Sequence, residues 1–529
     1  MLWGSQTGNA EDLATTSVAT LTARGIPARA VSMVDMSVAD LAAVRRLLVV
    51  TSTFGDGGPP DNAADLWDQL SGDDVPGLDG LDYAVFAIGD PSYDDFCGHG
   101  RGIDTRLGAL GATALLPRVD CEPDYAEPAA AWLEQVIAIL GTSTEPAEVA
   151  APPAMRRLFT RANPVRAGLV TNTLLSGAGS AKEVRQFGFD LSHAGVAYEA
   201  GDSLGIVASN SSAVVAEWID ATRLAPRTVV ELEGEERFLA DALETDLDIT
   251  KISSDFLAFV AERNSDSRLA TLLRRENKAK LEQYLWSMQA VDVLREFPVA
   301  ADAQEWVSVL KRLQPRQYSI SSSPKTSPHE VQLTVSVVRF ETEAGARRGG
   351  VCSTFLTDGD PDALAPVFLQ RSSHFRPPAD SDTPMIMVGP GTGIAPFRGF
   401  LHDRRADGHR GRNWLFFGEQ HEATDFYYRD ELEGMRDDGF LTRLDVAFSR
   451  DQRQKIYVQD RMLEHGLELW RWLQDGAHFY VCGDASRMAQ DVDDTLTTIA
   501  RRHGGLSEEA ALDFKKSLVA QKRYVRDVY

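Results

Sequence analysis

Short apolar runs alternate with stretches of helical period over the first 140 residues. Residues 47–51 and 83–88 form apolar runs of strand length, and each is followed by a glycine-rich loop. Residues 63–70 and 128–140 carry apolar positions at helical spacing. This alternation of strands and helices predicts a parallel α/β domain over residues 1–140.

The pattern then changes twice. Residues 141–163 are rich in Pro, Ala, Thr and Glu without a sustained period, which is typical of a flexible linker. From residue 164 short runs of period two appear, for example at 183–191, and they return at 331–338. Between them the period is helical, as at 255–263 and 281–296. We expect a β-barrel over 164–382 with a helical insertion at about 212–312.

Strand and helix alternation resumes towards the end of the chain. Apolar runs of strand length occupy residues 385–388, 414–417, 444–448 and 478–481. They predict a second parallel α/β domain over residues 383–529. The predicted fold class is therefore a multidomain α/β protein that also contains a β-barrel.

Composition supports a folded, multidomain chain. The 529 residues are 25% charged and 43% hydrophobic, which excludes wholesale disorder, collagen and coiled coil. The formal charge of -24 argues against nucleic acid and anionic membranes as partners. Residues 1–140 hold 21 acidic residues, seven arginines and no lysine. The acidic surface of this predicted domain either is simply solvated or serves as a docking face for a basic partner.

Cysteine usage and hydropathy indicate the compartment. No apolar run approaches the length of a membrane span, and the first residues lack the features of a secretory signal. The four cysteines include no C-x-x-C pair, so we expect no metal site and a cytoplasmic location.

The first loop with candidate chemistry follows the short apolar start. It consists of Gly4, Ser5, Gln6, Thr7, Gly8 and Asn9. Small and hydroxyl residues at a helix start are suited to a phosphate, although a plain capping loop uses the same residues. Two further loops, residues 51–57 and 89–97, follow the two apolar runs and each carries an aromatic residue, Phe54 or Tyr93. Open α/β sheets bind ligands at this end of their strands.

Taken together, SQTGN, TSTFGDG and GDPSYDDFC resemble the flavodoxin-like FMN domain of the diflavin reductases. The resemblance implies that Phe54 and Tyr93 flank the flavin ring. It places the phosphate at Ser5, Gln6, Thr7, Gly8 and Asn9. Further FMN contacts are implied for Ser52, Thr53, Gly55, Gly57, Gly89, Asp90, Phe96, Cys97 and Asp120.

The predicted barrel carries two motifs of the same family. Arg316, Tyr318 and Ser319 lie on one predicted strand, and Gly350, Val351, Cys352 and Ser353 open a helix. Alone, R-x-Y-S is a common surface pattern. Before G-G-x-x-S it resembles the FAD site of ferredoxin-reductase-like barrels, with Arg316 on the pyrophosphate, Tyr318 on the flavin and Thr334 as a further contact.

The last domain resembles a Rossmann-like NADP-binding domain. GPGTGIAPF follows a predicted strand, and Gly391 and Thr392 in it are implied contacts of the nicotinamide cofactor. The cluster after residue 448 suits a 2'-phosphate, which favours NADPH over NADH, although a solvated basic loop has the same composition. The implied contacts are Ser449, Arg450, Lys455, Tyr457, Gln459 and Asp491.

The family also implies catalytic residues and a reaction. Ser319, Cys482 and Asp527 match its hydride-transfer trio, and the terminal Tyr529 matches the aromatic residue that covers the FAD ring. Electrons would pass from NADPH to FAD, then to FMN and on to a haem-containing acceptor protein. No metal is expected within this chain.

Within the family, GDPSYDDFC, NWLFFGEQ and the ending RYVRDVY are most similar to the flavoprotein subunit of assimilatory sulfite reductase. This favours the sulfite reductase haemoprotein as acceptor. Alternatives are the reductase partner of a haem monooxygenase or of nitrate reductase, and a partner-docking module with impaired FMN binding. The last alternative follows from the first strand, because only Met1, Leu2 and Trp3 precede the phosphate loop. We expect either a start further upstream or a chain cut from a longer polypeptide.

Overall fold

The computed structural model forms two compact units. One comprises Met1–Arg157 with Ser209–Gln314, and the other Leu158–Ala208 with Pro315–Tyr529. The structure describes residues 1–5, 9–54, 57–72, 75–90, 93, 95–122, 125–141, 161, 163–194, 197–232, 234–360, 362–372, 374–485 and 487–529. No helix among these residues is long and apolar enough to cross a membrane.

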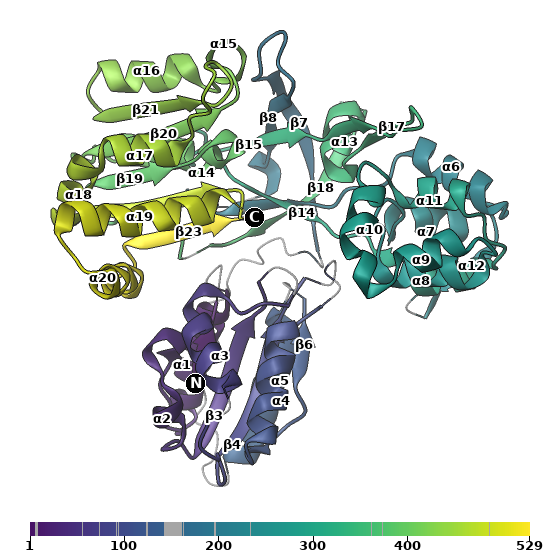
Figure 1. Cartoon of the computed structure of the whole chain (residues 1–529), viewed down its shortest axis with the longest axis horizontal. Helices are drawn as coiled ribbons and strands as arrows, with labels where there is room; N and C mark the ends of the chain where they lie inside the picture. Colours follow the sequence, from purple (N-terminus) through teal and green to yellow (C-terminus); the bar gives the residue numbers. More distant parts are fainter. Residues whose placement is uncertain are drawn as a thin grey trace. The chain divides into compact units, whose positions relative to one another are not determined.

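The N-terminal part is a parallel sheet between helices (Figure 1). Its strand order is β2-β1-β3-β4-β5, and β6 also pairs with β4. The strands are β1 (Leu2–Gly4), β2 (Val31–Ser32), β3 (Arg46–Ser52), β4 (Asp82–Ile88), β5 (Thr113–Ala114) and β6 (Val119–Cys121). This is the strand order of flavodoxin-like sheets.

Helices cover both faces of this sheet. Side chains of α1 (Asn9–Ala23) and α5 (Ala126–Leu140) pack on one face of β3 and β4. Those of α3 (Ala64–Ser71) and α4 (Gly98–Ala109) pack on the other. Apart from their first residues, β3 and β4 are buried throughout, so they are continuous apolar runs rather than alternating ones. The strands predicted at 47–51 and 83–88 are thereby confirmed.

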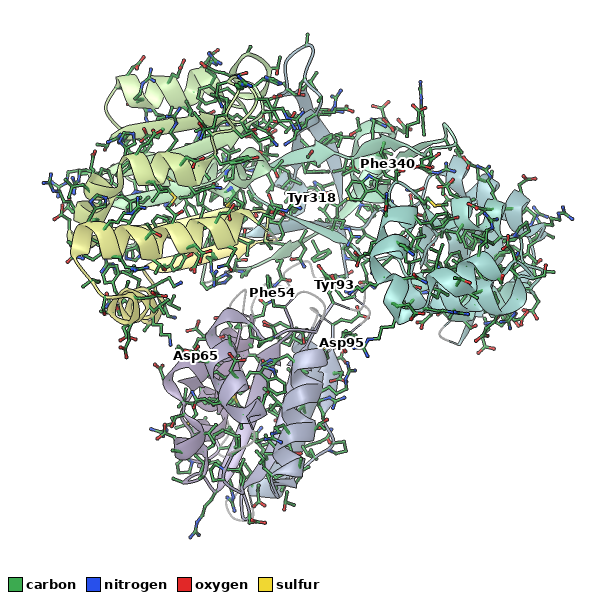
Figure 2. The ribbon with its side chains drawn as sticks, in the orientation of Figure 1. Phe54, Asp65, Tyr93, Asp95, Tyr318 and Phe340 are labelled. Carbon is green, nitrogen blue, oxygen red and sulfur yellow. The ribbon has the colours of Figure 1, made fainter. Side chains whose placement is uncertain are left out.

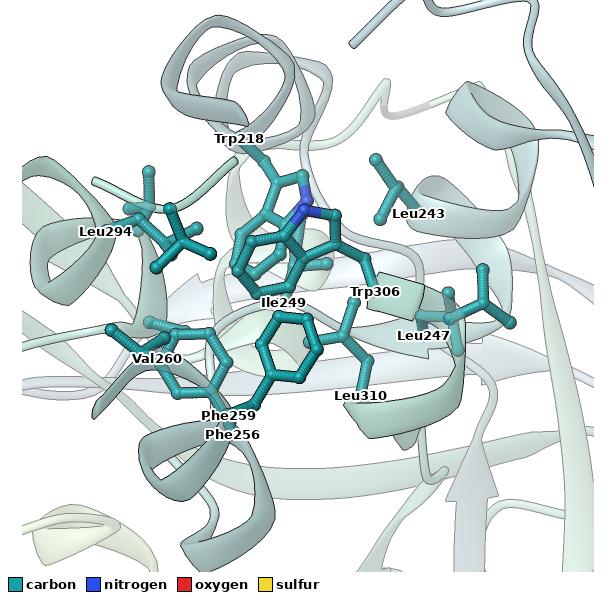
Figure 3. Packing of buried hydrophobic residues seen from close by; sticks show 14 of the residues in the cluster. Trp218, Leu243, Leu247, Ile249, Phe256, Phe259, Val260, Leu294, Trp306 and Leu310 are labelled. Carbon is teal, nitrogen blue, oxygen red and sulfur yellow. The ribbon is translucent and has the colours of Figure 1, made fainter. Parts of the chain in front are cut away.

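The segment from residue 212 to 312 is mainly helical. Its helices are α6 (Ser212–Thr222), α7 (Leu239–Thr245), α8 (Ser254–Arg263), α9 (Ser267–Leu272), α10 (Lys278–Leu285), α11 (Ala290–Glu296) and α12 (Ala303–Val309). Figure 3 shows its aromatic core, in which the rings of Trp218 and Trp306 meet edge to face with centroids 5.6 Å apart. Phe259 packs on Trp306 at 4.8 Å. This segment therefore has a hydrophobic core of its own.

The helical pattern at 281–296 is two helices, not one. Helix α10 ends at Leu285, and Ser287 adopts a left-handed backbone with φ of 65°. Gln289 then caps α11, and its backbone N–H donates to Asp292 Oδ2 at 2.8 Å. The apolar residues keep their helical spacing across this break, so the spacing alone does not reveal it. The break depends on a capping contact, which does not alter the spacing.

The barrel is antiparallel, in the order β14-β9-β18-β7-β8-β15. Its strands are β7 (Val165–Leu174), β8 (Glu183–Asp190), β9 (Ser203–Ile206), β14 (Arg316–Ser319), β15 (Glu330–Val337) and β18 (Leu364–Gln370). An isolated antiparallel bridge joins Ile320, after β14, to Leu333 of β15. This bridge brings the two ends of the sheet together and closes it.

The C-terminal part is a parallel sheet of order β21-β20-β19-β22-β23. Its strands are β19 (Met385–Val388), β20 (Asn413–Glu419), β21 (Arg443–Phe448), β22 (His478–Gly483) and β23 (Tyr524–Val528). Every residue of β20 is buried, with Trp414 and Phe416 packing on one face and Leu415 and Phe417 on the other. The four predicted strands are confirmed, whereas β23 carries no such apolar run and was not predicted.

Candidate functional site

The predicted phosphate loop begins at Ser5, directly after β1. The Ser5 backbone N–H donates to Asn62 Oδ1 at 2.8 Å, and Ser5 Oγ accepts from the backbone N–H of Ala10 at 3.2 Å. Asn9 begins α1, and its carbonyl accepts from Tyr125 at 3.3 Å. The predicted contacts Gln6, Thr7 and Gly8, and likewise Gly55 of the second loop, lie outside the described residues. Sequence reasoning missed Asn62, which is distant in sequence and belongs to no motif.

The two predicted ring loops meet at the start of α4. A Cβ on Gly98 would lie 2.7 Å from the Cα of Gly57, so only glycine permits this approach. Cys97 precedes α4 in a left-handed conformation, with φ of 54°. Its buried thiol donates to the Ala87 carbonyl at 3.6 Å, and burial raises the pKa of Cys97 to about 12. The thiol is therefore neutral and structural rather than reactive.

The two aromatic residues of these loops have the exposure expected of ring contacts. Figure 2 shows Phe54 and Tyr93 at the same end of the flavodoxin-like part. Tyr93 is 47% exposed and Phe54 is half-buried, so neither belongs to the core. Close by in sequence, Thr53 Oγ1 is buried without a hydrogen-bond partner among the described residues. An orphaned buried hydroxyl on the residue before Phe54 fits a flavin with polar edges.

The other predicted FMN contacts are placed as follows. Ser52 ends β3, and Gly89 and Asp90 follow β4. Phe96 packs against Gly89, with its ring 3.1 Å from the position of a Cβ there. Asp120 lies on β6 beside β4, and Arg118 donates to its carboxylate at 2.7 Å. Asp120 is thus already paired with a cation.

In the barrel, β14 presents the predicted FAD residues. Arg316 is exposed, whereas the half-buried Tyr318 packs against the barrel core. Burial raises the pKa of Tyr318, and the phenol forms a hydrogen bond with the Cys352 side chain. Residues two apart on a strand share a face, so Arg316 and Tyr318 present a cation and a ring together.

Helix α13 (Val351–Asp358) starts without a side-chain cap. Gly350 is its N-cap and provides no side-chain cap. Ser353 Oγ instead accepts from the Val338 backbone N–H at 3.1 Å and donates to the Gly350 carbonyl at 3.2 Å. An uncapped helix start fits a pyrophosphate. Thr334 is different: its buried hydroxyl bonds Tyr428 Oη at 2.7 Å and so joins β15 to the nucleotide-binding part.

The predicted catalytic trio converges within the second unit. Ser319 Oγ donates to Asp527 Oδ2 at 2.7 Å, and the Cys482 thiol donates to the same oxygen at 3.8 Å. Cys482 and Asp527 are also register partners of β22 and β23. Burial raises the pKa of Asp527, while the Ser319 and Cys482 hydrogen bonds oppose the shift. Burial raises the pKa of the Cys482 thiol as well.

The C-terminal residue is held at the same place. Tyr529 is 63% exposed, yet its backbone N–H donates to the Gly483 carbonyl at 3.0 Å and its hydroxyl lies 2.8 Å from Thr392 Oγ1. The turn that carries Thr392 packs tightly: a Cβ on Gly393 would overlap the Cys482 carbonyl. Gly391, with φ of 60°, is left-handed. The glycines therefore bring the nucleotide loop against the trio.

A cationic loop follows β21. Arg450, Arg453 and Lys455 are exposed, and within the described chain their side chains form no ion pair or hydrogen bond. Arg453 was not among the predicted contacts, although it lies in the same motif. A cluster of unpaired cations in an acidic chain fits a phosphate group.

The remaining predicted contacts surround this loop. Ser449 Oγ donates to the Glu419 carbonyl at 3.2 Å, and Gln459 Nε2 donates to Asp491 Oδ2 at 3.0 Å. Tyr457 caps α17 (Val458–Glu464) and is 44% exposed. An accessible ring beside the cations suits a flat base, so the carboxyl end of this sheet presents the parts of a dinucleotide site.

Comparison with known protein families agrees with these three parts. Residues 1–132 match the flavodoxin family, residues 157–355 the FAD binding domain family and residues 387–494 the oxidoreductase NAD-binding domain family. These domains on one chain define a flavin-dependent oxidoreductase whose cofactors are FMN, FAD and NADPH.

Curated relatives give the particular family. The chain is 42% identical to the sulfite reductase (NADPH) flavoprotein alpha-component of Bacillus subtilis over 537 residues, which span 100% of this chain and 89% of that protein. It is 41% identical to the protein of the same name from Klebsiella pneumoniae and 40% identical to that from Escherichia coli O139:H28, which it covers to 89% and 88%. The chain belongs to the family of sulfite reductase flavoprotein alpha-components.

Proposed function

We propose that this chain is the electron-donating flavoprotein of a sulfite reductase. The bound cofactors supply the redox chemistry, by which electrons from NADPH pass through FAD and FMN to the haemoprotein that reduces sulfite. The observation that carries the proposal is the convergence of Ser319, Cys482 and Asp527 with Thr392 and Tyr529 in one unit. The contacts join groups from the barrel to groups from the nucleotide-binding part, which supports one reaction site formed by both.

We assign the trio to positioning and charge stabilisation at that site. The half-buried Asp527 holds Ser319 and Cys482 in fixed orientations, and its carboxylate is ready to stabilise positive charge on a bound ring. Tyr529 would cover the ring of a bound FAD and would have to move for nicotinamide to bind there. Because the Tyr529 side chain is exposed and forms one hydrogen bond among the described residues, to Thr392, its movement would break few interactions.

The remaining roles follow the same geometry. Arg316 and the N-terminus of α13 would hold the FAD pyrophosphate, and Tyr318 would lie on the FAD ring. Arg450, Arg453 and Lys455 would hold the 2'-phosphate and so select NADPH. Phe54 and Tyr93 would flank the FMN ring, and Thr53 would be a hydrogen-bond partner for its polar edge.

The proposal includes a domain organisation. It comprises a flavodoxin-like domain over 1–140, a linker over 141–163, a barrel over 164–382 with an insertion at about 212–312, and an NADPH domain over 383–529. We also propose a cytoplasmic location, which the four free cysteines support. The partner is the sulfite reductase haemoprotein, which the names of the relatives favour over other haem proteins.

A comparison of acceptors tests this proposal. The purified chain, loaded with FMN and FAD and supplied with NADPH, is mixed in turn with a sulfite reductase haemoprotein, a haem monooxygenase and a nitrate reductase. We expect rapid haem reduction in the first alone. Equal or faster reduction of either other acceptor contradicts the proposed partner, while ferricyanide reduction in the same preparation reports that NADPH and FAD are working.

A further inference from the structure

A single histidine is buried beneath the flavodoxin-like loops. His99 lies in the first turn of α4 and is 2% exposed. Its ring contacts the Trp67 ring edge to face, with centroids 5.5 Å apart. Nδ1 lies 3.0 Å from Thr51 Oγ1, whereas Nε2 has no partner in the described part of the chain.

The hydrogen-bond partners of the His99 ring indicate which of its nitrogens carries the proton. The ring also bonds the backbone of Ser52, and this bond raises the pKa, so the ring donates and the carbonyl accepts. Since Nε2 has no partner among the described residues, Nδ1 carries the proton. Burial outweighs the hydrogen bond and lowers the pKa of His99 to about 4, which leaves the ring neutral at pH 7.

This proton assignment orders a chain of hydrogen bonds. With the proton on Nδ1, this one N–H is shared between the Ser52 carbonyl and Thr51 Oγ1, which lies 3.0 Å away. The Thr51 hydroxyl then has the Gly4 carbonyl at 3.3 Å and the Ser52 carbonyl at 3.2 Å as acceptors. Gly4 ends β1 directly before the phosphate loop, and Thr51 lies at the end of β3 before a ring loop. His99 follows the other ring loop. One buried chain therefore connects the bases of all three loops.

The packing around His99 leaves little room for movement where the three loops join the sheet and α4. A Cβ on Gly98 would lie 2.7 Å from the Cα of Gly57, and a Cβ on Gly100 would overlap Ala87 of β4. Helix α4 thus touches both a ring loop and the central sheet on either side of His99. A change at His99 is transmitted to the loops rather than absorbed by a gap.

We propose that His99 is a positioning residue for FMN, which acts through Thr51 to hold the three FMN loops in their binding arrangement. The inference rests on the proposed function only in taking FMN as the ligand of these loops. The described hydrogen bonds of the His99 ring go to Thr51 and to the Ser52 backbone, so we assign its effect on FMN to these two contacts.

The test compares paired variants of the full-length chain. His99→Leu and Thr51→Val remove the hydrogen bond, whereas His99→Asn and Thr51→Ser retain a donor or a hydroxyl at the same place. The dissociation constant of FMN is measured by titrating FMN into preparations depleted of FMN. We expect about tenfold weaker binding for the first pair, since loss of one buried hydrogen bond has an effect of this size. The second pair is expected to bind within about twofold of the unmodified chain.

Tyr83→Phe is the matched control. Tyr83 is buried in the same domain and donates to the Asp104 carbonyl at 3.0 Å, at the opposite end of β4 from the loops. It is expected to lower the thermal stability of the domain without changing the affinity for FMN. If Tyr83→Phe weakens FMN binding as much as His99→Leu, a general loss of stability explains both and the inference fails.

The remaining outcomes separate this inference from the proposed function. Unchanged FMN affinity in His99→Leu and Thr51→Val, beside tight binding by the unmodified chain, overturns the role of His99 alone. Failure of the conservative variants to restore affinity overturns it too. If the unmodified chain binds no FMN, the proposed function itself is contradicted, whatever the variants show. FAD content and NADPH-dependent ferricyanide reduction are expected to remain unchanged in all variants.

Discussion

At the scale of single residues, burial sets the protonation of the groups around both flavin sites. Asp527 is the informative case, because burial raises its pKa while hydrogen bonds from Ser319 and Cys482 favour its ionised form. The ionised form is the one that stabilises positive charge on a bound ring. Ser319 therefore affects the pH range in which Asp527 is ionised and can stabilise positive charge.

We predict that Ser319→Ala moves the acid limb of the pH profile upward. Without the Ser319 donor the pKa of Asp527 rises further, because the ionised carboxylate loses a hydrogen bond that stabilises it. The measurement is kcat/KM for NADPH in ferricyanide reduction across pH. Ser336→Ala, an exposed serine of β15, is the control. An acid limb that stays in place would show that Asp527 does not titrate in this step.

His99 gives a second prediction, for stability against acid. Burial lowers its pKa from 6.5 to about 4, so the folded domain favours the neutral ring more than the unfolded chain does. Its contribution is intact above pH 6.5 and is lost as the pH falls towards 4, by roughly 3 kcal/mol in total. His99 is the only histidine in residues 1–140, which simplifies the comparison. Unfolding of the FMN-free chain between pH 7 and 4.5 is expected to show a weaker pH dependence in His99→Asn; identical slopes would contradict the assignment.

At the scale of elements, buried parallel strands were predictable and contacts between distant segments were not. Strands β3, β4 and β20 are continuous apolar runs because helices cover both of their faces. The break between α10 and α11 depends on a capping contact that leaves the apolar period unchanged. Ser319 and Asp527 are 208 residues apart, so their pairing followed only from family resemblance. Asn62 and His99 belong to no motif, and their positions are apparent only in the folded chain. Arg453 lies inside the motif after β21 but at a position that the motif leaves open.

The loop after β21 carries a prediction of its own. We expect each of three single substitutions to raise the KM for NADPH about tenfold: Arg450→Ala, Arg453→Ala and Lys455→Ala. A charged hydrogen bond to phosphate contributes about 1.5–3 kcal/mol, and NADH lacks this phosphate. kcat with NADPH and the KM for NADH are expected to change little. Arg436→Ala, an exposed arginine paired with Asp437 on α16 (Arg429–Asp437), is the control. An equal rise in the KM for NADPH and for NADH would mean that the loop does not bind the 2'-phosphate.

At the scale of the whole molecule, the account requires the flavodoxin-like domain to meet two partners in turn. It must receive electrons from the FAD site and then deliver them to the haemoprotein. The acidic character of residues 1–140 suits an encounter with a basic protein surface. Residues 142–160, most of the proposed linker, lie outside the described part of the chain.

Shortening the proposed linker tests this requirement. Removal of about ten residues between 142 and 160 is expected to slow reduction of the haemoprotein several-fold, because a shorter tether restricts the reach of the domain. Ferricyanide reduction at the FAD site is expected to change little. A scrambled linker of the same composition and full length controls for sequence effects, and a proportional loss of both activities would contradict the two-partner scheme.

The central claim is that electrons leave this chain through FMN to a sulfite reductase haemoprotein. The direct measurement is the rate of haem reduction by the NADPH-supplied chain before FMN removal, after it, and after FMN is restored. The account predicts that haem reduction is lost on FMN removal and recovers on restoration, while ferricyanide reduction persists throughout. Haem reduction that continues without FMN, or that is absent when both flavins are bound, would contradict it.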